Sequence, residues 1–542
     1  MVLRHLQKYP GLRVTVMAAI AFFVIVLAFS LYRYHIFYAD SDHGIFSQVF
    51  WNSSQGRFFQ SSISSTYSVN IFREGDVPEV FYHRLAQHFT PALLLWVPFY
   101  ILFPSPITLI VLKTALVAAA GLVLYALSRQ YLNSRMSGMI ALSFYGANTV
   151  IGPILGEFYD FCQIPLFVFG LLLAMEQRWW WLFSILVGLT LAVREDAGLV
   201  VLGVGLYLIL SKRYPRIGLT VCAVSLTYMA VLTNWIMPLF AQEVPQRFMI
   251  EEFGQYTNNQ DASTLEVIGA MLSQPQLLLA ELFSPVDKTI RYLLGHGLPL
   301  AFIPVLSPEA WIISGFPLAE NLLRQTNSPL DVNIRFTSPI VPGLFYGAIL
   351  WWSKHESQFK ASLVRNFWTV CICLSLLLTF TSNPHRAWSF IIPDSIDPWL
   401  YVPPTQQWQH ASQLRSLLAQ IPPDASVSSS RYIAAHIPNR RAVLRFPLLQ
   451  FRNDAREVTS TDYIIVDFWY PAQFQSVFGV SRRELQSHIP AVTAIVEQGE
   501  YGVIDFKNDI ILMRRGADSD SEAIAAWLAF KQKIEPVLNA ET

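Results

Sequence analysis

Charged residues are scarce in this sequence of 542 residues. Only 14% of the residues are charged, whereas soluble domains average about 25%. This scarcity excludes a disordered chain, a coiled coil and an ordinary cytosolic enzyme. Lysine and arginine together number 38, as do aspartate and glutamate, so the net charge is zero. We therefore expect no nucleic acid as a partner.

Cysteine is almost as rare, with four residues in the whole chain. All four lie in or beside apolar stretches, and none has the spacing to a histidine that a zinc site requires. We expect buried free thiols that pack as small apolar groups. The four are Cys162, Cys222, Cys371 and Cys373.

Apolar residues are abundant instead, at 53% of the sequence, and the mean hydropathy is +0.38. Apolar stretches near the length of a membrane span recur along the chain, which predicts a mainly α, polytopic membrane protein that contacts the lipid bilayer. The first stretch, residues 14–32, follows Arg4, Lys8 and Arg13 and has no small-residue cleavage site after it. We interpret it as an uncleaved span with a cytoplasmic N-terminus.

Ten further stretches complete a prediction of eleven spans. Basic residues concentrate in the connections that this count assigns to the cytoplasm, as the positive-inside rule expects. The acidic connections fall on the opposite side. The stretches are residues 107–127, 137–153, 164–177, 179–193, 197–210, 217–239, 291–306, 309–323, 338–352 and 364–381.

Residues 88–103 are apolar but contain Pro91 and Pro98. A full crossing here would invert every later connection, so we interpret the segment as a re-entrant or interfacial helix pair that ends at residues 104–106. Irregular backbone at such depth needs cover from protein or from a wet cavity, which makes the segment a candidate wall of a site. The alternative is a twelfth span.

The predicted membrane domain, residues 1–381, has large extracytoplasmic loops at 33–87 and 241–290. In the first loop, residues 44–59 have an amphipathic pattern that is suited to lying on a membrane surface. Residues 382–542 predict a small extracytoplasmic α/β domain. Its expected helices are residues 406–420 and 519–539, and its expected strands are 425–429, 441–446, 463–468 and the hairpin 501–506 with 510–514. No glycine-rich phosphate loop is present, so we assign this domain no cofactor.

The strongest polar cluster, Asp40-Ser41-Asp42-His43, comes directly after the first span. Two carboxylates two residues apart can share a divalent cation, or one can act as a general base while hydrogen bonds hold the other. The alternative is a solvated loop with Asp42 as a helix N-cap. His43, His83 and His88 could bind a metal, although a lone histidine is more often simply hydrogen-bonded. The sequence leaves the metal unknown.

Further ionisable residues lie near the predicted span ends. A charge there costs free energy unless it has an oppositely charged partner or contacts water. Arg194, Glu195 and Asp196 can form a local salt bridge, or an acid can face a cavity while Arg194 meets a phosphate. Glu157 and Asp160 are three residues apart and would share a face of a helical turn. The predicted substrate-binding residues are His88, Glu157, Asp160, Arg194, Glu195, Asp196, Arg57 and Arg84.

Four arginines on the predicted outer side are candidates to hold an anionic lipid carrier, because the guanidinium fork matches phosphate oxygens. The alternative is that they anchor the protein at the membrane interface. They are Arg57, Arg84, Arg324 and Arg335.

The stretch at residues 42–52, DHGIFSQVFWN, resembles the D-x-G-I-F-x-Q-x-x-W-N stretch of a prokaryotic membrane family called domain of unknown function 2079. Later parts of the chain resemble that family's other landmarks, and the resemblance covers nearly the whole sequence. The family has no settled activity, so the resemblance implies a fold more than a reaction. These landmarks are HFTP at 88–91, PSP at 104–106, RED at 194–196 and IPPDA at 421–425.

The layout also resembles the GT-C glycosyltransferases, such as the protein mannosyltransferases and the aminoarabinose transferase of lipid A. These polytopic enzymes use polyprenyl-phosphate sugars, and their first extracytoplasmic loop carries an essential acid. The resemblance implies that Asp42 is the catalytic acid, with Asp40 as the second choice. It also implies a polyprenyl-phosphate-linked sugar as a partner and the cytoplasmic (inner) membrane as the location.

We therefore predict a GT-C-like transferase in which an arginine or a divalent cation stabilises the leaving group. Two alternatives stay open. A transporter or flippase of lipid-linked or small polar substrates would have internal repeats and broken helices at mid-membrane, but no clear repeat relates the two halves of the sequence. A non-catalytic scaffold would use its tail to bind an envelope partner.

Overall fold

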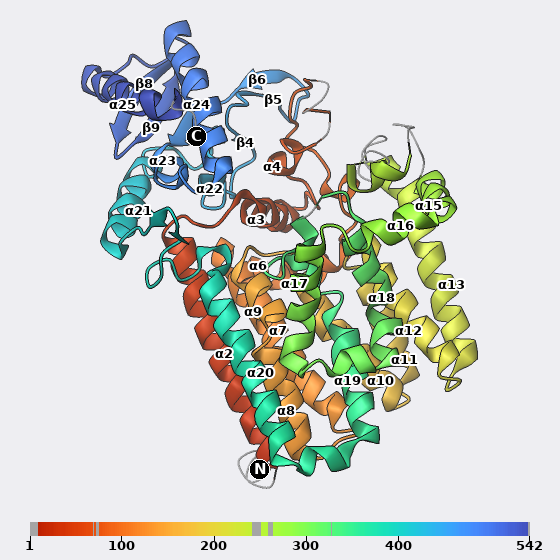
Figure 1. Ribbon diagram of the computed structural model, residues 1–542. Helices are drawn as coiled ribbons and strands as arrows, with labels where there is room; N and C mark the ends of the chain where they lie inside the picture. Colours follow the sequence, from red (N-terminus) through yellow and green to blue (C-terminus); the bar gives the residue numbers. More distant parts are fainter. Residues whose placement is uncertain are drawn as a thin grey trace. The chain divides into compact units, whose positions relative to one another are not determined.

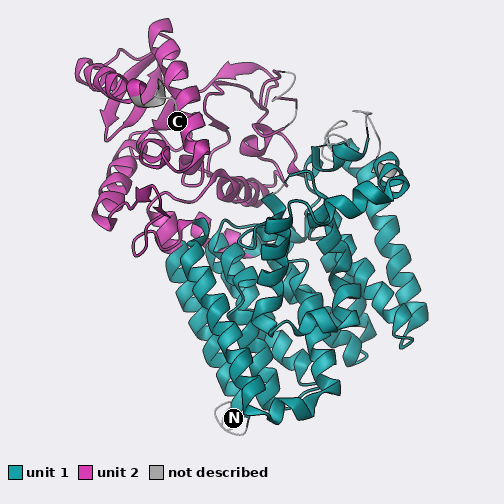
Figure 2. Cartoon of the chain, in the orientation of Figure 1, with its two compact units in different colours: residues 1–30, 85–98, 109–385 teal, residues 31–84, 99–108, 386–542 magenta. Residues whose placement is uncertain are grey.

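The computed structural model describes residues 9–68, 70–71, 75–240, 251–257, 264–326 and 328–539. The chain divides into two compact units (Figure 2), of which unit 1 comprises residues 1–30, 85–98 and 109–385. Unit 2 comprises residues 31–84, 99–108 and 386–542. It thus joins the first predicted loop to the C-terminal tail, whereas the sequence placed that loop with the membrane domain. Arg4, Lys8 and parts of the predicted loop 241–290 lie outside the described residues.

The chain is a multi-pass helical protein (Figure 1), as predicted. Within the described ranges, four helices are long and apolar enough to cross a membrane, and the bent pair α8 (Ser134–Tyr145) and α9 (Asn148–Leu155) is a possible fifth crossing. The four are α2 (Pro10–His35), α7 (Pro106–Ser128), α20 (Ser362–Ser382) and the stretch Pro215–Leu239, which begins as α13 (Pro215–Val231).

The other expected spans of unit 1 correspond to shorter helices. α12 packs against α13 and α18, α18 packs against α19, and α10 packs against α11. Two more helices, α15 (Thr264–Ser273) and α16 (Pro275–Glu281), fall in the predicted loop 241–290. The shorter helices are α10 (Ile164–Glu176), α11 (Trp180–Leu191), α12 (Gly198–Leu210), α17 (Val286–Gly297), α18 (Pro308–Leu323) and α19 (Val341–Lys354).

The apolar segment that begins at Pro91 consists of a 3-10 helix, η2 (Pro91–Trp96), that continues as α6 (Val97–Leu102). At 1.5–2.0 Å per residue its length is about 20 Å, well short of the ~30 Å hydrocarbon core. This length favours the predicted re-entrant or interfacial segment over a twelfth span.

Unit 2 is built on a five-stranded sheet with the order β4-β3-β7-β9-β8. β3 pairs in parallel with β4 and β7, while β9 is antiparallel to β7 and β8. The predicted α/β domain and its hairpin are thereby confirmed. The strands are β3 (Val427–Ser429), β4 (Val443–Arg445), β7 (Tyr463–Asp467), β8 (Tyr501–Lys507) and β9 (Ile510–Arg515).

Helices cover both faces of this sheet. Leu414 and Leu417 of α21 (Pro404–Leu418) share one apolar cluster with Val427 and Ile465 of the sheet. On the other face of the sheet, α24 (Gly479–Gln498) and α25 (Ser521–Asn539) form a second apolar cluster with strand residues such as Ile464 and Val466. The sequence predicted α21 and α25 but not α24, and it also missed the small ladder of β5 (Gln450–Arg452) and β6 (Val458–Ser460).

Helix α3 (Ser41–Ser54) is part of the interior of unit 2. Its apolar residues Ile45, Phe46, Val49 and Phe50 are at most 5% exposed. Ile45 joins the same apolar cluster as the α21 leucines. The predicted contact of these side chains with a membrane surface is therefore wrong, because protein covers them.

Gln48 fixes α3 to its surroundings in unit 2. Its Nε2 donates to the Ser62 hydroxyl and to the Arg440 carbonyl oxygen, both at 3.0 Å. Its Oε1 accepts from the Ser61 hydroxyl at 2.8 Å and from the Ile63 N–H at 3.1 Å. A single fully buried amide thus links α3, the segment that follows it and the C-terminal tail.

All four cysteines lie in unit 1 and are free thiols. Cys162 and Cys371 are buried as predicted, and Cys222 is half-buried. Cys373 is exposed on α20, so the expectation of a buried thiol is wrong there, because it lies on a face of the helix that no other part of the described chain covers.

Replacing Gln48 with leucine should destabilise unit 2 by about 2–4 kcal/mol, because the Ile63 N–H and the Arg440 carbonyl would stay buried without partners. The measurement is thermal unfolding of the detergent-solubilised protein, with limited proteolysis to locate the loosened region. Gln55→Leu, on the exposed C-terminal end of α3, is the control and should leave the unfolding midpoint in place. Equal midpoints for the two variants would contradict the role of Gln48.

Acid should destabilise unit 2 through His436. Its ring lies 4.1 Å from that of Tyr34 and 3.8 Å from that of Phe37. Burial lowers the pKa of His436 well below its usual value, and the charges of His43, Arg415 and His35 add to this. The unfolded chain therefore binds the proton first, and stability should fall as the pH drops below about 6.5, by at most about 1.4 kcal/mol per pH unit. In unfolding measurements between pH 7 and pH 5, His436→Phe should reduce the dependence of the free energy of unfolding on pH. An unchanged pH dependence would exclude His436 as its source.

Candidate functional site

The two predicted catalytic carboxylates stand at the beginning of α3, in unit 2. Asp40, rather than Asp42, is the N-cap, and it accepts from the Ser41 N–H at 2.6 Å. The helix begins earlier than predicted, which places Asp42 in its first turn. Asp40 also lies 3.6 Å from the Arg431 guanidinium, which in turn contacts Glu484 at 3.0 Å.

The charges of both carboxylates influence the pKa of Tyr67, whose hydroxyl lies 2.6 Å from that of Ser41. Burial raises the pKa of Tyr67 to about 12; Arg445 opposes this rise, and Asp40 and Asp42 add to it. The carboxylates are therefore close to the same phenol. Asp40 caps the helix and pairs with Arg431, and both Asp40 and Asp42 are half-exposed.

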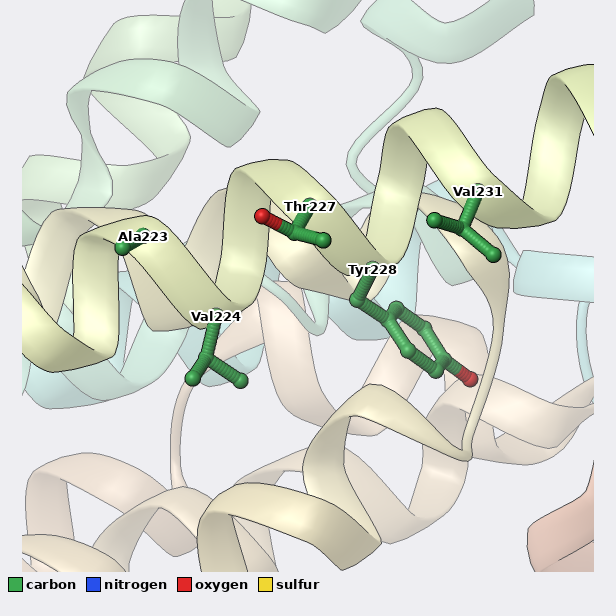
Figure 3. Close-up of a pocket in the computed structure, with 5 residues that line it drawn as sticks. All are labelled: Ala223, Val224, Thr227, Tyr228 and Val231. Atoms are coloured by element: carbon green, nitrogen blue, oxygen red, sulfur yellow. The ribbon is translucent and has the colours of Figure 1, made fainter.

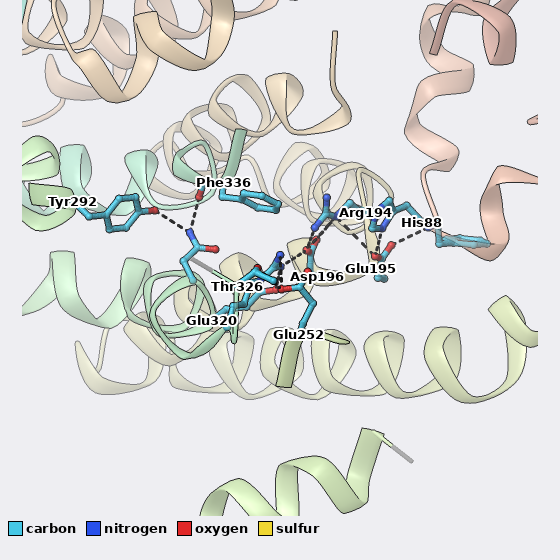
Figure 4. Close-up of polar contacts among 12 residues, drawn as sticks. His88, Arg194, Glu195, Asp196, Glu252, Tyr292, Glu320, Thr326 and Phe336 are labelled. Atoms are coloured by element: carbon cyan, nitrogen blue, oxygen red, sulfur yellow. Dashed lines mark hydrogen bonds and ion pairs between the residues drawn. The ribbon is translucent and has the colours of Figure 1, made fainter. Parts of the chain in front are cut away.

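In unit 1, a second set of predicted residues does come together (Figure 4). Arg194 is 1% exposed, and its Nε donates to both carboxylate oxygens of Asp196, at 2.9 and 3.1 Å. Glu195 accepts from the Phe89 N–H at 2.8 Å and lies 2.8 Å from Nδ1 of His88. The short 3-10 turn η4 (Glu195–Ala197), between α11 and α12, positions both acids.

Three guanidinium groups surround the ring of Phe336 in the same unit. Their distances to the ring centroid are 5.8 Å for Arg194, 4.6 Å for Arg324 and 5.4 Å for Arg335. Arg324 pairs with Glu320 at 2.7 Å. This arrangement combines cation–π contacts with ion pairs in a largely buried place.

Arg194 keeps its charge despite burial. Burial alone would lower its pKa, but Asp196, Asp160 and Glu195 together raise the pKa above the ordinary value. A dense set of buried charges costs free energy unless each is paired, and in a membrane protein it is a functional-site hypothesis by default. We call Arg194, Glu195, Asp196, Glu320, Arg324 and Phe336 the buried charge cluster.

Glu157 and Asp160 do not share a helical face, so that expectation is wrong. Helix α9 ends at Leu155, and Tyr159 has an extended backbone with φ −148°. Asp160 begins a separate 3-10 turn and is 2% exposed, and its charge acts on Arg194. Glu157 instead lies 3.9 Å from Nδ1 of His385.

Arg57 and Arg84 belong to unit 2 and support α3. Nε of Arg57 donates to Asn52 at 3.0 Å, and the Arg84 guanidinium lies 4.5 Å from the centroid of the Phe46 ring. Burial, together with the charge of Arg441, lowers the pKa of Arg57. A role for these arginines at a carrier phosphate stays a prediction.

Among the described residues, no three His, Cys, Asp or Glu side chains come together as metal ligands. Nε2 of His43 contacts the Pro106 carbonyl oxygen at 3.1 Å, and burial lowers the pKa of His83. His88 is occupied with Glu195. A divalent cation at Asp40 and Asp42 stays a prediction, and no chemical step is derived through one.

Two hollows on the outside of unit 1 are apolar. One, of about 420 Å³, lies along α13 and is lined by Ala223, Val224, Thr227, Tyr228 and Val231 (Figure 3). Another, of about 430 Å³, lies between α11 and α13. Neither has a charged lining residue, so neither offers groups for acid–base chemistry.

The family described as "Predicted membrane protein (DUF2079)" has a model that matches residues 33–512. The chain belongs to this family. Membership confirms the resemblance drawn from residues 42–52. A comparison with curated proteins found no match.

Among solved structures, the chain is similar to ArnT from Cupriavidus metallidurans bound to undecaprenyl phosphate. The identity is 10% and the TM-score is 0.42, over 90% of this chain and 97% of that one.

Sequence reasoning missed Glu320 and Phe336. A detectable pattern was present, because Glu320 and Arg324 are four residues apart at the end of an otherwise apolar stretch, where an unpaired acid would be costly. Nothing in the sequence indicated that Arg194 and Arg324 lie beside Phe336, since these contacts join three separate segments.

Replacing Arg194 with methionine should destabilise unit 1 by about 3–5 kcal/mol, because it leaves the half-buried Asp196 without its main partner. The measurement is the unfolding midpoint of the solubilised protein. Arg216→Met, at an exposed position of α13, is the matched control and should unfold like the unchanged protein. A shift of the same size in both variants would show that the Arg194 pair does not stabilise the fold.

Proposed function

We propose that this chain is a GT-C-like glycosyltransferase that moves a sugar from a polyprenyl-phosphate carrier to an acceptor on the outer face of the cytoplasmic membrane. In this proposal the N-terminus is cytoplasmic and the C-terminal domain is extracytoplasmic. The observation that carries the proposal is the state of Asp42. It is a half-exposed carboxylate in the first turn of α3, within the stretch whose sequence resembles the family's motif.

Asp42 would act as the general base. It would take the proton of an acceptor hydroxyl while that oxygen forms a bond to the anomeric carbon of the donor sugar. The bond from the anomeric carbon to the phosphate oxygen would break with its electron pair, and the carrier would leave as polyprenyl phosphate. The position of Asp42 on α3 supports this role. A general base must stay within hydrogen-bond reach of the proton that it takes, and the helix restricts where the carboxylate can lie.

The departing phosphate gains negative charge, which guanidinium groups stabilise well. A lipid-phosphate donor requires no nucleotide site. The abundant apolar surface of a membrane protein also supports a lipid substrate.

One observation favours the transport alternative. Helices α8 and α9 are bent by 41° at a short break, and broken helices are typical of secondary transporters. A flippase would not need Asp42 as a base, so a test of that residue separates the two functions.

Replacing Asp42 with asparagine should reduce sugar transfer by roughly 10²–10⁴-fold, the usual contribution of a general base. The measurement is lipid and glycan analysis of a deletion strain that carries either the unchanged gene or the variant. We expect the deletion and Asp42→Asn strains to accumulate a polyprenyl-phosphate sugar and to lack its glycan product.

Asp76→Asn, an exposed acid of the same loop, is the matched control and should restore transfer fully. Asp40→Asn should retain much of the activity, because asparagine is also a good N-cap. If Asp42→Asn restored the glycan as well as the unchanged gene does, Asp42 would be excluded as the base and the flippase alternative would gain support.

A further inference from the structure

Unit 2 contains a polar hollow of about 510 Å³ that no step above uses. Arg445 and the residues after it line one side, the first half of α24 lines another, and Thr66 and Ile71 from the segment after α3 complete the lining. The α24 residues Arg483, Glu484, Ser487 and His488 are spaced three or four apart, so they share one helix face. The hollow is thus formed by three segments of the same unit.

Its position in the sheet is one where ligands bind in other proteins. Arg445 is the last residue of β4, and β4, β3 and β7 run parallel, so their carboxyl ends meet at one edge. In open α/β sheets, ligands bind in the crevice outside those ends. The volume also falls in the range of about 300–1,000 Å³ that is usual for small-molecule sites.

The charges in the hollow do not cancel. Glu484 is paired with Arg431, at 3.0 Å. Within the described ranges, neither Arg445 nor Arg483 has an ion pair or hydrogen bond with an acid, and Arg445 lies over the ring of Tyr67 at 5.0 Å. Two positive groups therefore face the hollow without a carboxylate of their own.

The remaining polar groups are neutral. Burial, with the charges of Arg445 and Arg431, lowers the pKa of His488 to about 4, so its ring carries no charge near neutral pH. Ser487 adds an exposed hydroxyl, and Leu448 and Val480 add apolar surface. The hollow is larger than a bare phosphate ion, which leaves room for the group that an oxyanion would be attached to.

We propose that this hollow binds the phosphate group of a phosphomonoester, with Arg445 and Arg483 as its charged donors and Ser487 as a neutral donor. A phosphomonoester carries up to two negative charges, which matches two guanidinium groups better than a single carboxylate does. The phosphate can belong to a water-soluble molecule or to a lipid headgroup. The proposal does not depend on the transferase reaction.

The test uses the full-length protein in detergent and titrates it calorimetrically with inorganic phosphate, glycerol 3-phosphate and acetate. We expect saturable binding of both phosphates, tighter for glycerol 3-phosphate, and much weaker binding of acetate. Arg445→Gln and Arg483→Gln should each weaken binding by about tenfold or more, as loss of a charged hydrogen bond does. Arg482→Gln, one residue away and not part of the lining, is the matched control and should bind unchanged.

A second arm identifies the source of the phosphate, with nanodiscs of phosphatidic acid and phosphatidylcholine compared with phosphatidylcholine alone. Competition by phosphatidic acid with glycerol 3-phosphate would support a headgroup, and its absence would support a soluble ligand. Ser487→Trp, which fills the hollow from an exposed position, should abolish binding even if Arg445→Gln folds poorly. Lack of saturable phosphate binding, equal binding of acetate, or full binding by Arg483→Gln would overturn the proposal.

Discussion

The buried amide of Gln48 is the contact on which unit 2 depends most. Through it, a short helix that follows the first span in the chain becomes part of a domain whose strands lie almost 400 residues later. The apolar face of α3 alone would pack equally well against lipid. The polar contacts of Gln48 therefore determine that α3 packs inside unit 2. Because they fix α3, they also fix the acids at its beginning. Gly44 also allows α3 to pack closely in unit 2, since a Cβ at this position would lie 2.8 Å from the Ala434 carbonyl oxygen.

Unit 1 uses buried polarity in a different way. The buried charge cluster brings together acids and arginines from several helices around one aromatic ring, and each guanidinium meets both a carboxylate and a π face. Such a cluster contributes little net stability compared with well-packed apolar residues. In a membrane protein with so few charges, such a cluster is a functional-site hypothesis by default.

Much of the fold could be predicted from the sequence, because its signals are local. Apolar length identified the helices, and alternation with turn residues identified β7 and the β8–β9 hairpin. The Arg194–Asp196 pair was predictable because only one residue separates its members. The interior position of α3, the partners of Arg324 and the hollow beside Arg445 were not predictable, since each joins segments that are distant in the chain. Helix α24 escaped notice because Gly479 and Pro490 make its sequence look less helical than it is.

The placement of the cysteines has a practical consequence. Because every thiol of the chain belongs to unit 1, the α/β domain and the loop that completes it hold together without covalent cross-links, and their packing is insensitive to the redox state of the surrounding compartment. A single cysteine introduced on the surface of unit 2 would be the sole thiol of that unit. A membrane-impermeant maleimide could then report directly on which side of the bilayer the domain resides.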